Sequence, residues 1–124
     1  MMSDRELLEM AAKAVGYDTS HLMNRDRLVL DPPVAALCVR ENGRLVHTAW
    51  NPLESDADAL RLAVKLSMGV QSNGPGHWQT QNATIVLFES DCPRRLTQAH
   101  EGDPYAATRR AITRAAAEIG KAMP

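Results

Sequence analysis

Five arginines in the last third of the chain are the residues whose chemistry stands out. They form two pairs, Arg94-Arg95 and Arg109-Arg110, with Arg114 one helical turn beyond Arg110. A guanidinium presents a planar fork of N–H donors that matches a phosphate group, which a lysine ammonium does not. Three of these arginines also follow a predicted helix start, where backbone N–H groups carry partial positive charge. The pattern predicts an anion site built on Arg109, Arg110 and Arg114, with Arg94 and Arg95 as further candidates. The alternative is a solvent-exposed helix face.

Trp50 is the aromatic candidate for the same site. It ends a predicted strand just before Asn51-Pro52, a position where a ring either closes the core or stacks on a purine or ribose. His47 lies three residues back, so a regular strand would direct His47 and Trp50 to opposite faces. We therefore do not expect these two residues to form one clamp within a single subunit.

The remaining reactive side chains do not form a catalytic or metal-binding pattern. The four histidines have neither i, i+4 nor His-x-His spacing, and no Cys-x-x-Cys pair is present. Cys38, in an apolar run, is expected in the core, and Cys92 is expected to be an exposed free thiol. Asp56 and Asp58 sit where carboxylates cap a helix, and Gly74-Pro75-Gly76 lacks the lysine of a phosphate loop. We therefore predict no catalytic residue, no metal and no cofactor. The histidines are His21, His47, His77 and His100.

Length and composition describe the protein that must position these residues. The chain has 124 residues, 44% hydrophobic and 23% charged, which predicts a single globular domain over residues 1–124. Its net charge of −1 differs from the basic excess of nucleic-acid-binding proteins, although it leaves a local patch open. The longest strongly apolar run, Ile85–Phe88, is far shorter than a membrane span. Neither a nucleic-acid partner nor a membrane is expected.

Three helices and a hairpin are the clearest predicted elements. Ser3 and Glu6 form a capping box before a helix over Asp4–Val15. A second helix starts at Ser55 or Asp56, ends near Ser67, and has apolar residues on more than one stripe, so it should be nearly enclosed. A third begins at Asp103-Pro104. Asn42-Gly43 predicts a tight turn that pairs Val34–Val39 with Arg44–Ala49.

The other strands are signalled less clearly. Short strands are predicted at Arg27–Leu30, from Val70, at His77–Gln81 and at Thr84–Phe88, whereas residues 89–102 read as irregular. The sequence therefore predicts an α+β fold: an antiparallel sheet of three to five strands with helices at the start, middle and C-terminal end.

Two segments carry a family resemblance. Trp50–Leu66 and Asp103–Gly120, together with the opening helix, resemble the NinX-like proteins, a group of small phage and prophage proteins from proteobacteria. The family usually carries Asp-Gly-Asp where this chain has Ser55-Asp56-Ala57-Asp58, a departure that leaves the helix cap intact. The resemblance implies a viral origin, hence a bacterial host cytoplasm, but supplies no catalytic residue.

These observations favour a non-enzymatic phage accessory protein that sequesters a small phosphorylated ligand, such as a cyclic nucleotide used as a host immune signal. One alternative is a phage protein that binds and modulates a host protein, and another is a small hydrolase. We also expect a homo-oligomer, because the alanine-rich last helix allows close helix–helix approach.

Overall fold

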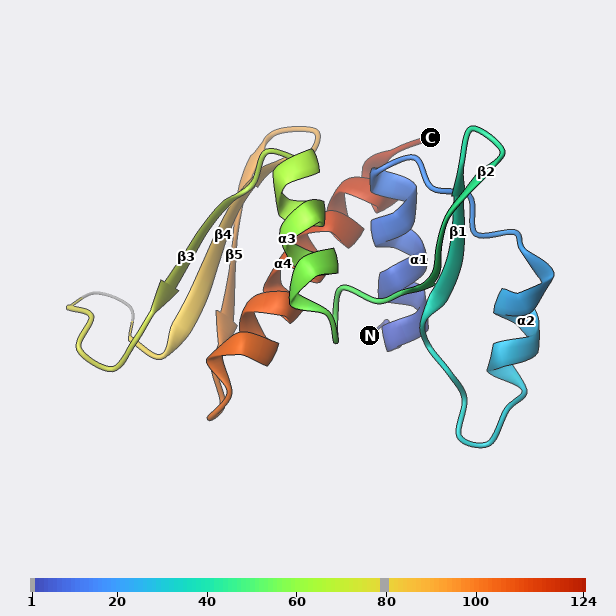
Figure 1. Cartoon of the computed structure of the whole chain (residues 1–124). Helices are drawn as coiled ribbons and strands as arrows, with labels where there is room; N and C mark the ends of the chain where they lie inside the picture. The colour runs from blue at the N-terminus through green and yellow to red at the C-terminus, as the bar shows by residue number, and fades with distance from the viewer. Residues whose placement is uncertain (1, 79–80) are drawn as a thin grey trace.

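The chain has an α+β fold. The structure, a computed structural model, describes residues 2–78 and 81–124. Within these residues four helices accompany a two-stranded and a three-stranded antiparallel sheet (Figure 1). The helices are α1 (Asp4–Ala14), α2 (Leu22–Leu28), α3 (Asp56–Lys65) and α4 (Pro104–Ala122). The strands are β1 (Leu37–Glu41), β2 (Arg44–Trp50), β3 (Gly69–Asn73), β4 (Ala83–Glu89) and β5 (Pro93–Ala99). None of the described helices meets the length and hydropathy needed to cross a membrane.

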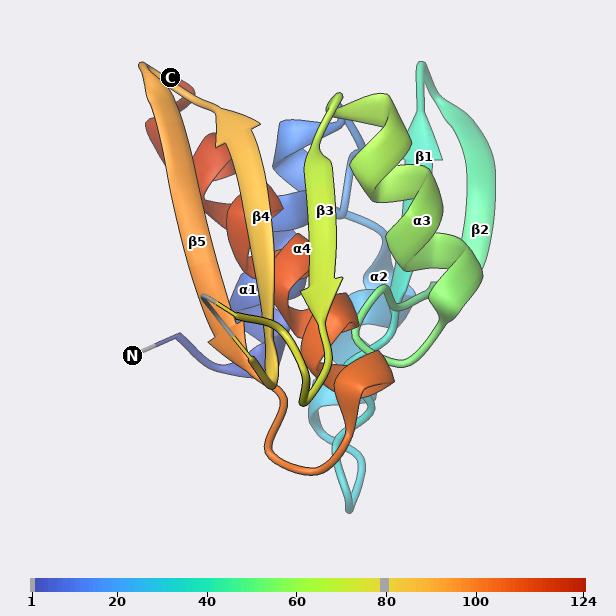
Figure 2. The ribbon, with the colours of Figure 1, turned by 90° about the vertical axis from the view of Figure 1, so that its left-hand side faces the viewer.

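Helix α4 lies at the centre of the molecule. It packs against α1, against the sheet in the order β3-β4-β5, and against α3 (Figures 1 and 2). Its alanine-rich face is buried, with Ala111, Ala115 and Ala116 fully covered. The face that we expected to support a homo-oligomer is therefore used within the chain, and the oligomer stays a prediction without that support.

The approach of α1 to α4 is close because one position has no side chain. A Cβ built on Gly120 would lie 2.0 Å from the carbonyl oxygen of Met10. Glycine thus lets the two helix backbones approach more closely than any other residue would allow.

The predicted hairpin is confirmed, but its first strand runs over Leu37–Glu41 rather than Val34–Val39. Asn42 and Gly43 have positive φ angles of 54° and 77°, as a type I′ turn requires, and β1 and β2 pair antiparallel around them. The ladder is irregular farther from the turn. Leu37 pairs with Trp50 and Val39 with His47. Between these two pairs β2 advances by three residues and β1 by two, so β2 contains a bulge. This bulge overturns the assumption of a regular strand.

The prediction of only three helices is wrong, because α2 occupies residues expected to include a strand at Arg27–Leu30. Tertiary contacts override the local strand propensity here. Arg27 Nη1 donates to the Ala36 carbonyl (3.0 Å), and the buried Asn24 side chain bonds to the backbone of β1. These bonds tie a short helix against the hairpin.

The strand predictions hold in part. The strands expected from Val70 and at Thr84–Phe88 are confirmed as β3 and β4. The expectation of an irregular 89–102 is wrong, because Pro93–Ala99 forms β5 after the short turn at residues 90–92. The strand expected at His77–Gln81 is not found at residues 77, 78 and 81, and residues 79–80 lie outside the described chain. The five strands also form two sheets rather than one.

Helix α3 is less enclosed than its apolar pattern suggested. Ala59, Leu62 and Ala63 are buried, but Leu60 and Val64 are 64% and 70% exposed. In Figure 1 the three-stranded sheet is seen nearly edge-on, and α3 and α4 lie on the same side of it. In Figure 2 α3 lies beyond β3, on the side away from β4. The helical layer thus extends past the edge of the sheet.

Candidate functional site

The three arginines of α4 point to three different elements. Arg109 Nε donates to the Leu53 carbonyl oxygen (2.8 Å), and its Nη1 pairs with Asp56 Oδ1 at the start of α3 (2.8 Å). Arg110 Nη2 pairs with Asp4 Oδ1 on α1 (2.9 Å). Arg114 Nη1 donates to Gln98 Oε1 on β5 (2.7 Å). These three guanidiniums do not meet in a common site.

The N-terminus of α4 is already occupied by a carboxylate of the same chain. Asp103 Oδ1 accepts hydrogen bonds from the backbone N–H groups of Tyr105 (3.1 Å) and Ala106 (3.0 Å). Pro104 has no N–H to offer. The expected contribution of this helix end to an anion site is therefore taken up by the cap.

A different grouping of the predicted arginines does form. Arg94 and Arg95 on β5 line one shallow cavity of about 540 Å³ together with Arg114 on α4. We call it the arginine cavity. Its other lining residues are Phe88, Cys92, Leu96, Thr97 and Glu118.

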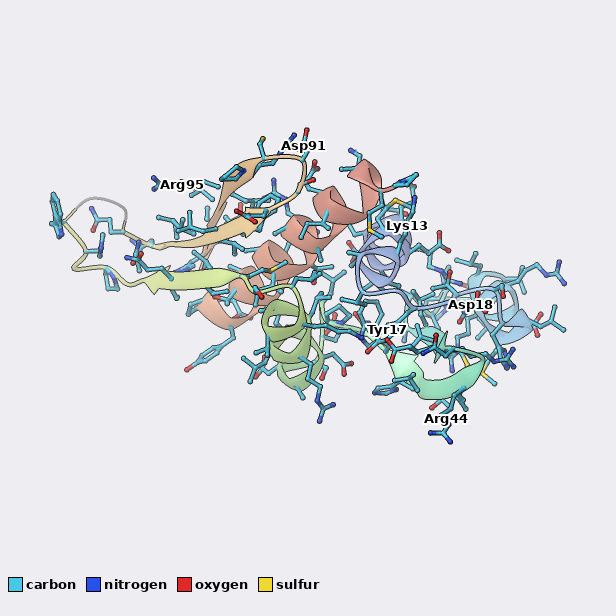
Figure 3. The ribbon with its side chains drawn as sticks, turned by 90° about the horizontal axis from the view of Figure 1, so that it is seen from above. Lys13, Tyr17, Asp18, Arg44, Asp91 and Arg95 are labelled. Carbon is cyan, nitrogen blue, oxygen red and sulfur yellow. The ribbon has the colours of Figure 1, made fainter. Side chains whose placement is uncertain are left out.

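The guanidiniums of the arginine cavity differ in how strongly they are engaged. Arg94 is held by Asp91, with its Nη2 3.0 Å from Asp91 Oδ1, and Arg114 has one bond to Gln98. The Arg95 side chain has neither a hydrogen bond nor an ion pair with any residue in 2–78 or 81–124. Figure 3 shows Arg95 extending from the three-stranded sheet on the side away from α4. Arg95 is therefore the donor most available to a ligand.

The pair at the rim has a clear electrostatic signature. The hydrogen bond from Arg94 holds the pKa of Asp91 below its ordinary value, and the same bond raises the pKa of Arg94. Asp91 is thus ionised at neutral pH and competes with any bound anion for the Arg94 guanidinium.

Trp50 lies in the core, apart from the arginine cavity. The residue is 4% exposed, and its ring meets that of Tyr17 edge-to-face, with ring centroids 5.6 Å apart. The Tyr17 ring is covered in turn by Lys65, whose Nζ lies 4.8 Å from the ring centroid. This placement corresponds to the core-closing alternative for Trp50.

His47 and Trp50 nevertheless share a cavity, contrary to our expectation. Both line a small space of about 120 Å³ together with Asp58. The bulge in β2 is the physical reason, because its extra residue changes the alternation of side chains between the two positions.

His47 is engaged by Asp58 and by the backbone of its own strand. His47 Nε2 lies 3.7 Å from Asp58 Oδ1, while His47 Nδ1 accepts the Ala49 N–H at 2.9 Å. Both ring nitrogens thus face partners within the chain. Asp58 Oδ2 also accepts the Asn51 N–H (3.0 Å), so this carboxylate holds the strand-to-helix connection, while Ser55 caps α3.

Another cavity, larger than the arginine cavity, was not predicted from the sequence. It has a volume of about 970 Å³ and lies between β3, α3 and the first turns of α4. We call it the β3–α3 groove. Its mostly apolar wall includes Ala59, Leu60, Ala63, Val70 and Ile112, and Arg109 is the one predicted site residue among those lining it. The sequence signal for this cavity was the apolar residues on more than one stripe of α3. We attributed all of these stripes to the core, whereas Leu60 and Val64 are exposed.

A buried polar cluster closes one wall of the groove. His100 is 8% exposed, and its Nε2 lies 3.0 Å from Thr84 Oγ1 and 3.3 Å from Ser72 Oγ. Thr84 Oγ1 is in turn 2.7 Å from Thr108 Oγ1 on α4. The cluster links the sheet to α4 behind the groove.

The cysteines lie as expected, Cys38 buried and Cys92 exposed. Within the described residues no group of three or more His, Cys, Asp or Glu side chains is arranged to hold a metal ion. Comparison of the chain with protein-family models, curated proteins and solved structures found no match.

Proposed function

We propose that this chain is a non-enzymatic binding protein that sequesters a small phosphorylated ligand at the arginine cavity. The observation that supports the proposal is the grouping of Arg94, Arg95 and Arg114 around one solvent-open space. Forked donors of this kind bind phosphate oxygens in pairs, and each such contact is stronger than a neutral hydrogen bond.

The charges of the cavity favour a ligand with one or two phosphate groups. Three arginines line the cavity against a single lining carboxylate residue, Glu118, while Asp91 engages Arg94 from the rim. The wall offers Phe88 and Leu96 as apolar surface. Phe88 is 5% exposed, so ligand recognition rests on the phosphate rather than on stacking of a base.

Sequestration fits this cavity better than turnover. The strongest nucleophile among its lining residues is Cys92, whose Sγ lies 3.7 Å from Asp91 Oδ1. No histidine is among the described residues that line it, and the Asp91 carboxylate, whose pKa Arg94 holds below the ordinary value, is a weak base for activating the thiol. Together with the resemblance to NinX-like proteins, this supports a phage accessory protein that holds a cyclic nucleotide or a related immune signal in the host cytoplasm.

Titration calorimetry tests the proposal with defined probes: inorganic pyrophosphate, a cyclic mononucleotide and a cyclic dinucleotide. Arg95→Ala should weaken binding by roughly tenfold to a hundredfold, because one charge-assisted contact contributes about 1.5–3 kcal/mol. Arg110→Ala is the matched control, because Arg110 pairs with Asp4 away from the cavity. Equal affinity in the parent and in Arg95→Ala, or no heat with any of the three probes, would contradict the proposal.

The β3–α3 groove favours a second candidate, the binding of a host protein. Here an exposed strand edge and an apolar helix face lie side by side. That surface is developed below.

A further inference from the structure

We infer that the β3–α3 groove is a strand-addition site, in which an extended peptide segment of a partner pairs with the free edge of β3 and lies over α3. The inference specifies the surface through which the second candidate function would act. It is independent of the arginine cavity, which lies at β5 on the opposite edge of the same sheet.

The β3 edge lacks the devices that normally prevent strands from pairing with other chains. Edge strands are commonly protected by charged residues, proline or a bulge. Strand β3 reads Gly-Val-Gln-Ser-Asn and pairs with β4 in unbroken register. The other edge, β5, begins with Pro93, Arg94 and Arg95. The β5 edge of this sheet thus carries residues that hinder pairing with another strand, and the β3 edge carries none.

The open edge offers backbone hydrogen bonds directed toward the groove. In an antiparallel pair, alternate residues direct both their N–H and C=O groups to the neighbouring strand, and the others direct both groups away. About two or three of the five residues of β3 therefore present both groups outward, where no described strand meets them. An incoming strand would pair with these groups as β4 does on the other side.

Helix α3 provides the apolar surface that such a strand would cover. Leu60 lines the groove and is 64% exposed, and Val64 follows one helical turn later at 70%. Figures 1 and 2 place α3 on the side of the sheet that also holds α4, but beyond the β3 edge. A strand added to β3 would extend the sheet over α3, in the way that β4 and β5 lie over α4.

The space matches one strand. A five-residue strand occupies roughly 800 Å³, from the strand spacing, the distance between packed layers and the rise per residue. The groove has about 970 Å³. A second copy of the chain fits less well, because two-fold pairing of β3 with β3 would bring the α3 of that copy into the layer that α4 already fills. A single extended segment brings no second layer with it.

The groove also indicates the chemistry of the segment. Val70 and the apolar face of α3 favour a segment with apolar side chains at alternate positions, because alternate side chains of a strand lie on the one face directed toward the helices. Glu101 lines the groove next to the start of α4 and has no ion-pair partner in the described parts of the chain. Asp56 lines the same cavity, paired with Arg109. A lysine or arginine near one end of the segment would complement the Glu101 carboxylate.

Selection from a random seven-residue peptide library, with the full chain as target and its Leu60→Glu variant as counter-target, tests the inference. We expect peptides with alternating apolar residues and a basic residue near one end to be enriched on the parent chain. The best of them, synthesised and labelled, should bind at least tenfold more weakly to Leu60→Glu. Leu45→Glu is the matched control, because Leu45 is 51% exposed on β2 and should leave binding unchanged.

Hydrogen exchange then identifies the mode of binding. Bound peptide should slow exchange of β3 amides at least tenfold, and the same peptide N-methylated at alternate backbone positions should fail to bind. Arg95→Ala should bind the peptide normally, which separates this inference from the phosphate-binding proposal. The inference is overturned if no peptide is enriched over the counter-target, if binding leaves β3 exchange unchanged, or if the N-methylated peptide binds equally well. The inference is also overturned if light scattering shows that the chain alone is a dimer and the β3 amides of that dimer are already protected from hydrogen exchange.

Discussion

The side chain of Asn24 pairs with both backbone groups of Cys38, as a neighbouring strand would. Asn24 Nδ2 donates to the Cys38 carbonyl oxygen (2.8 Å), and the Cys38 N–H donates to Asn24 Oδ1 (2.6 Å). Asn24 is 3% exposed and Cys38 1%, so neither backbone group has solvent as a substitute. This pairing attaches α2 to the edge of the hairpin.

Asn24→Ala should therefore destabilise the protein by about 2–4 kcal/mol, because it leaves two buried backbone groups of Cys38 without partners. Urea unfolding followed by circular dichroism measures the loss. Asp26→Ala, at an exposed position of the same helix, should change stability by less than about 0.5 kcal/mol. Equal effects of the two substitutions would show that the Asn24 pairing contributes nothing specific.

Gly120→Ala should destabilise the protein by about 1–3 kcal/mol or more. The added methyl group would meet the Met10 carbonyl oxygen at 2.0 Å, and overpacking of this kind outweighs the gain of about 1 kcal/mol in helix propensity. Gly69→Ala is the control, since its nearest neighbour would be Leu87 Cβ at an ordinary 3.6 Å. A thermal unfolding midpoint for Gly120→Ala at or above that of the parent would contradict the packing described for α1 and α4.

Arg109 should prove to be a structural residue. Its bonds to the Leu53 carbonyl oxygen and to Asp56 connect α4 to the start of α3, and its side chain is 18% exposed. Arg109→Lys keeps the charge but loses the forked geometry, so we expect a loss of about 1 kcal/mol in unfolding free energy. Pyrophosphate affinity should remain unchanged. A large loss of pyrophosphate affinity in Arg109→Lys, with normal stability, would instead show that Arg109 binds the ligand.

Asp91 should titrate below the ordinary aspartate value of 3.8, because Arg94 stabilises its ionised form. A lowered pKa in the folded state means that the pair contributes stability above pH 3.8, and that this contribution is lost as the pH falls through the folded value. NMR titration of the Asp91 carboxyl carbon measures the midpoint directly. In Arg94→Ala the midpoint should move up toward 3.8. An unmoved midpoint would show that the ion pair does not persist in solution.

The Asp91 carboxylate also sets the strength of anion binding at neutral pH. Asp91→Asn should free the Arg94 guanidinium and tighten pyrophosphate binding several-fold, because the competing charge is removed. Asp4→Asn, which releases Arg110 on the far side of α4, serves as the comparison and should leave affinity unchanged. Weaker binding in Asp91→Asn would mean that Asp91 orients Arg94 rather than competing with the ligand.

Local signals in the sequence were sufficient for the elements with strong end markers. The Ser3 and Asp103 caps and the Asn42-Gly43 turn act over a few residues, and each lies where it was predicted. Helix α2 depends on bonds to the backbone of β1, which lies later in the chain, and strand β5 pairs with β4 through a short turn that lacks an Asn-Gly marker. Spacing along a chain does not show such contacts.

The candidate site was harder to predict for a related reason. Helical spacing placed Arg110 and Arg114 on one face, yet Asp4 attracts the first and Gln98 binds the second. The arginine cavity exists because β5 brings Arg94 and Arg95 near α4, and residues 89–102 had been read as irregular. The β3–α3 groove arises from the exposure of α3, which depends on how far the sheet extends.

The contact between α1 and α4 also has a consequence for how the chain reaches its native state. Roughly 90 residues separate the two helices, and closing so long a loop costs entropy before any contact between them forms. The glycine at position 120 gives no side-chain contact to guide their encounter. Folding should therefore be slow for a chain of this size, with the rate set by the arrival of α4 at α1. Helix α4 also contacts α3 and the three-stranded sheet, so displacement of α4 would disrupt all of these interfaces, and unfolding should be a single cooperative event.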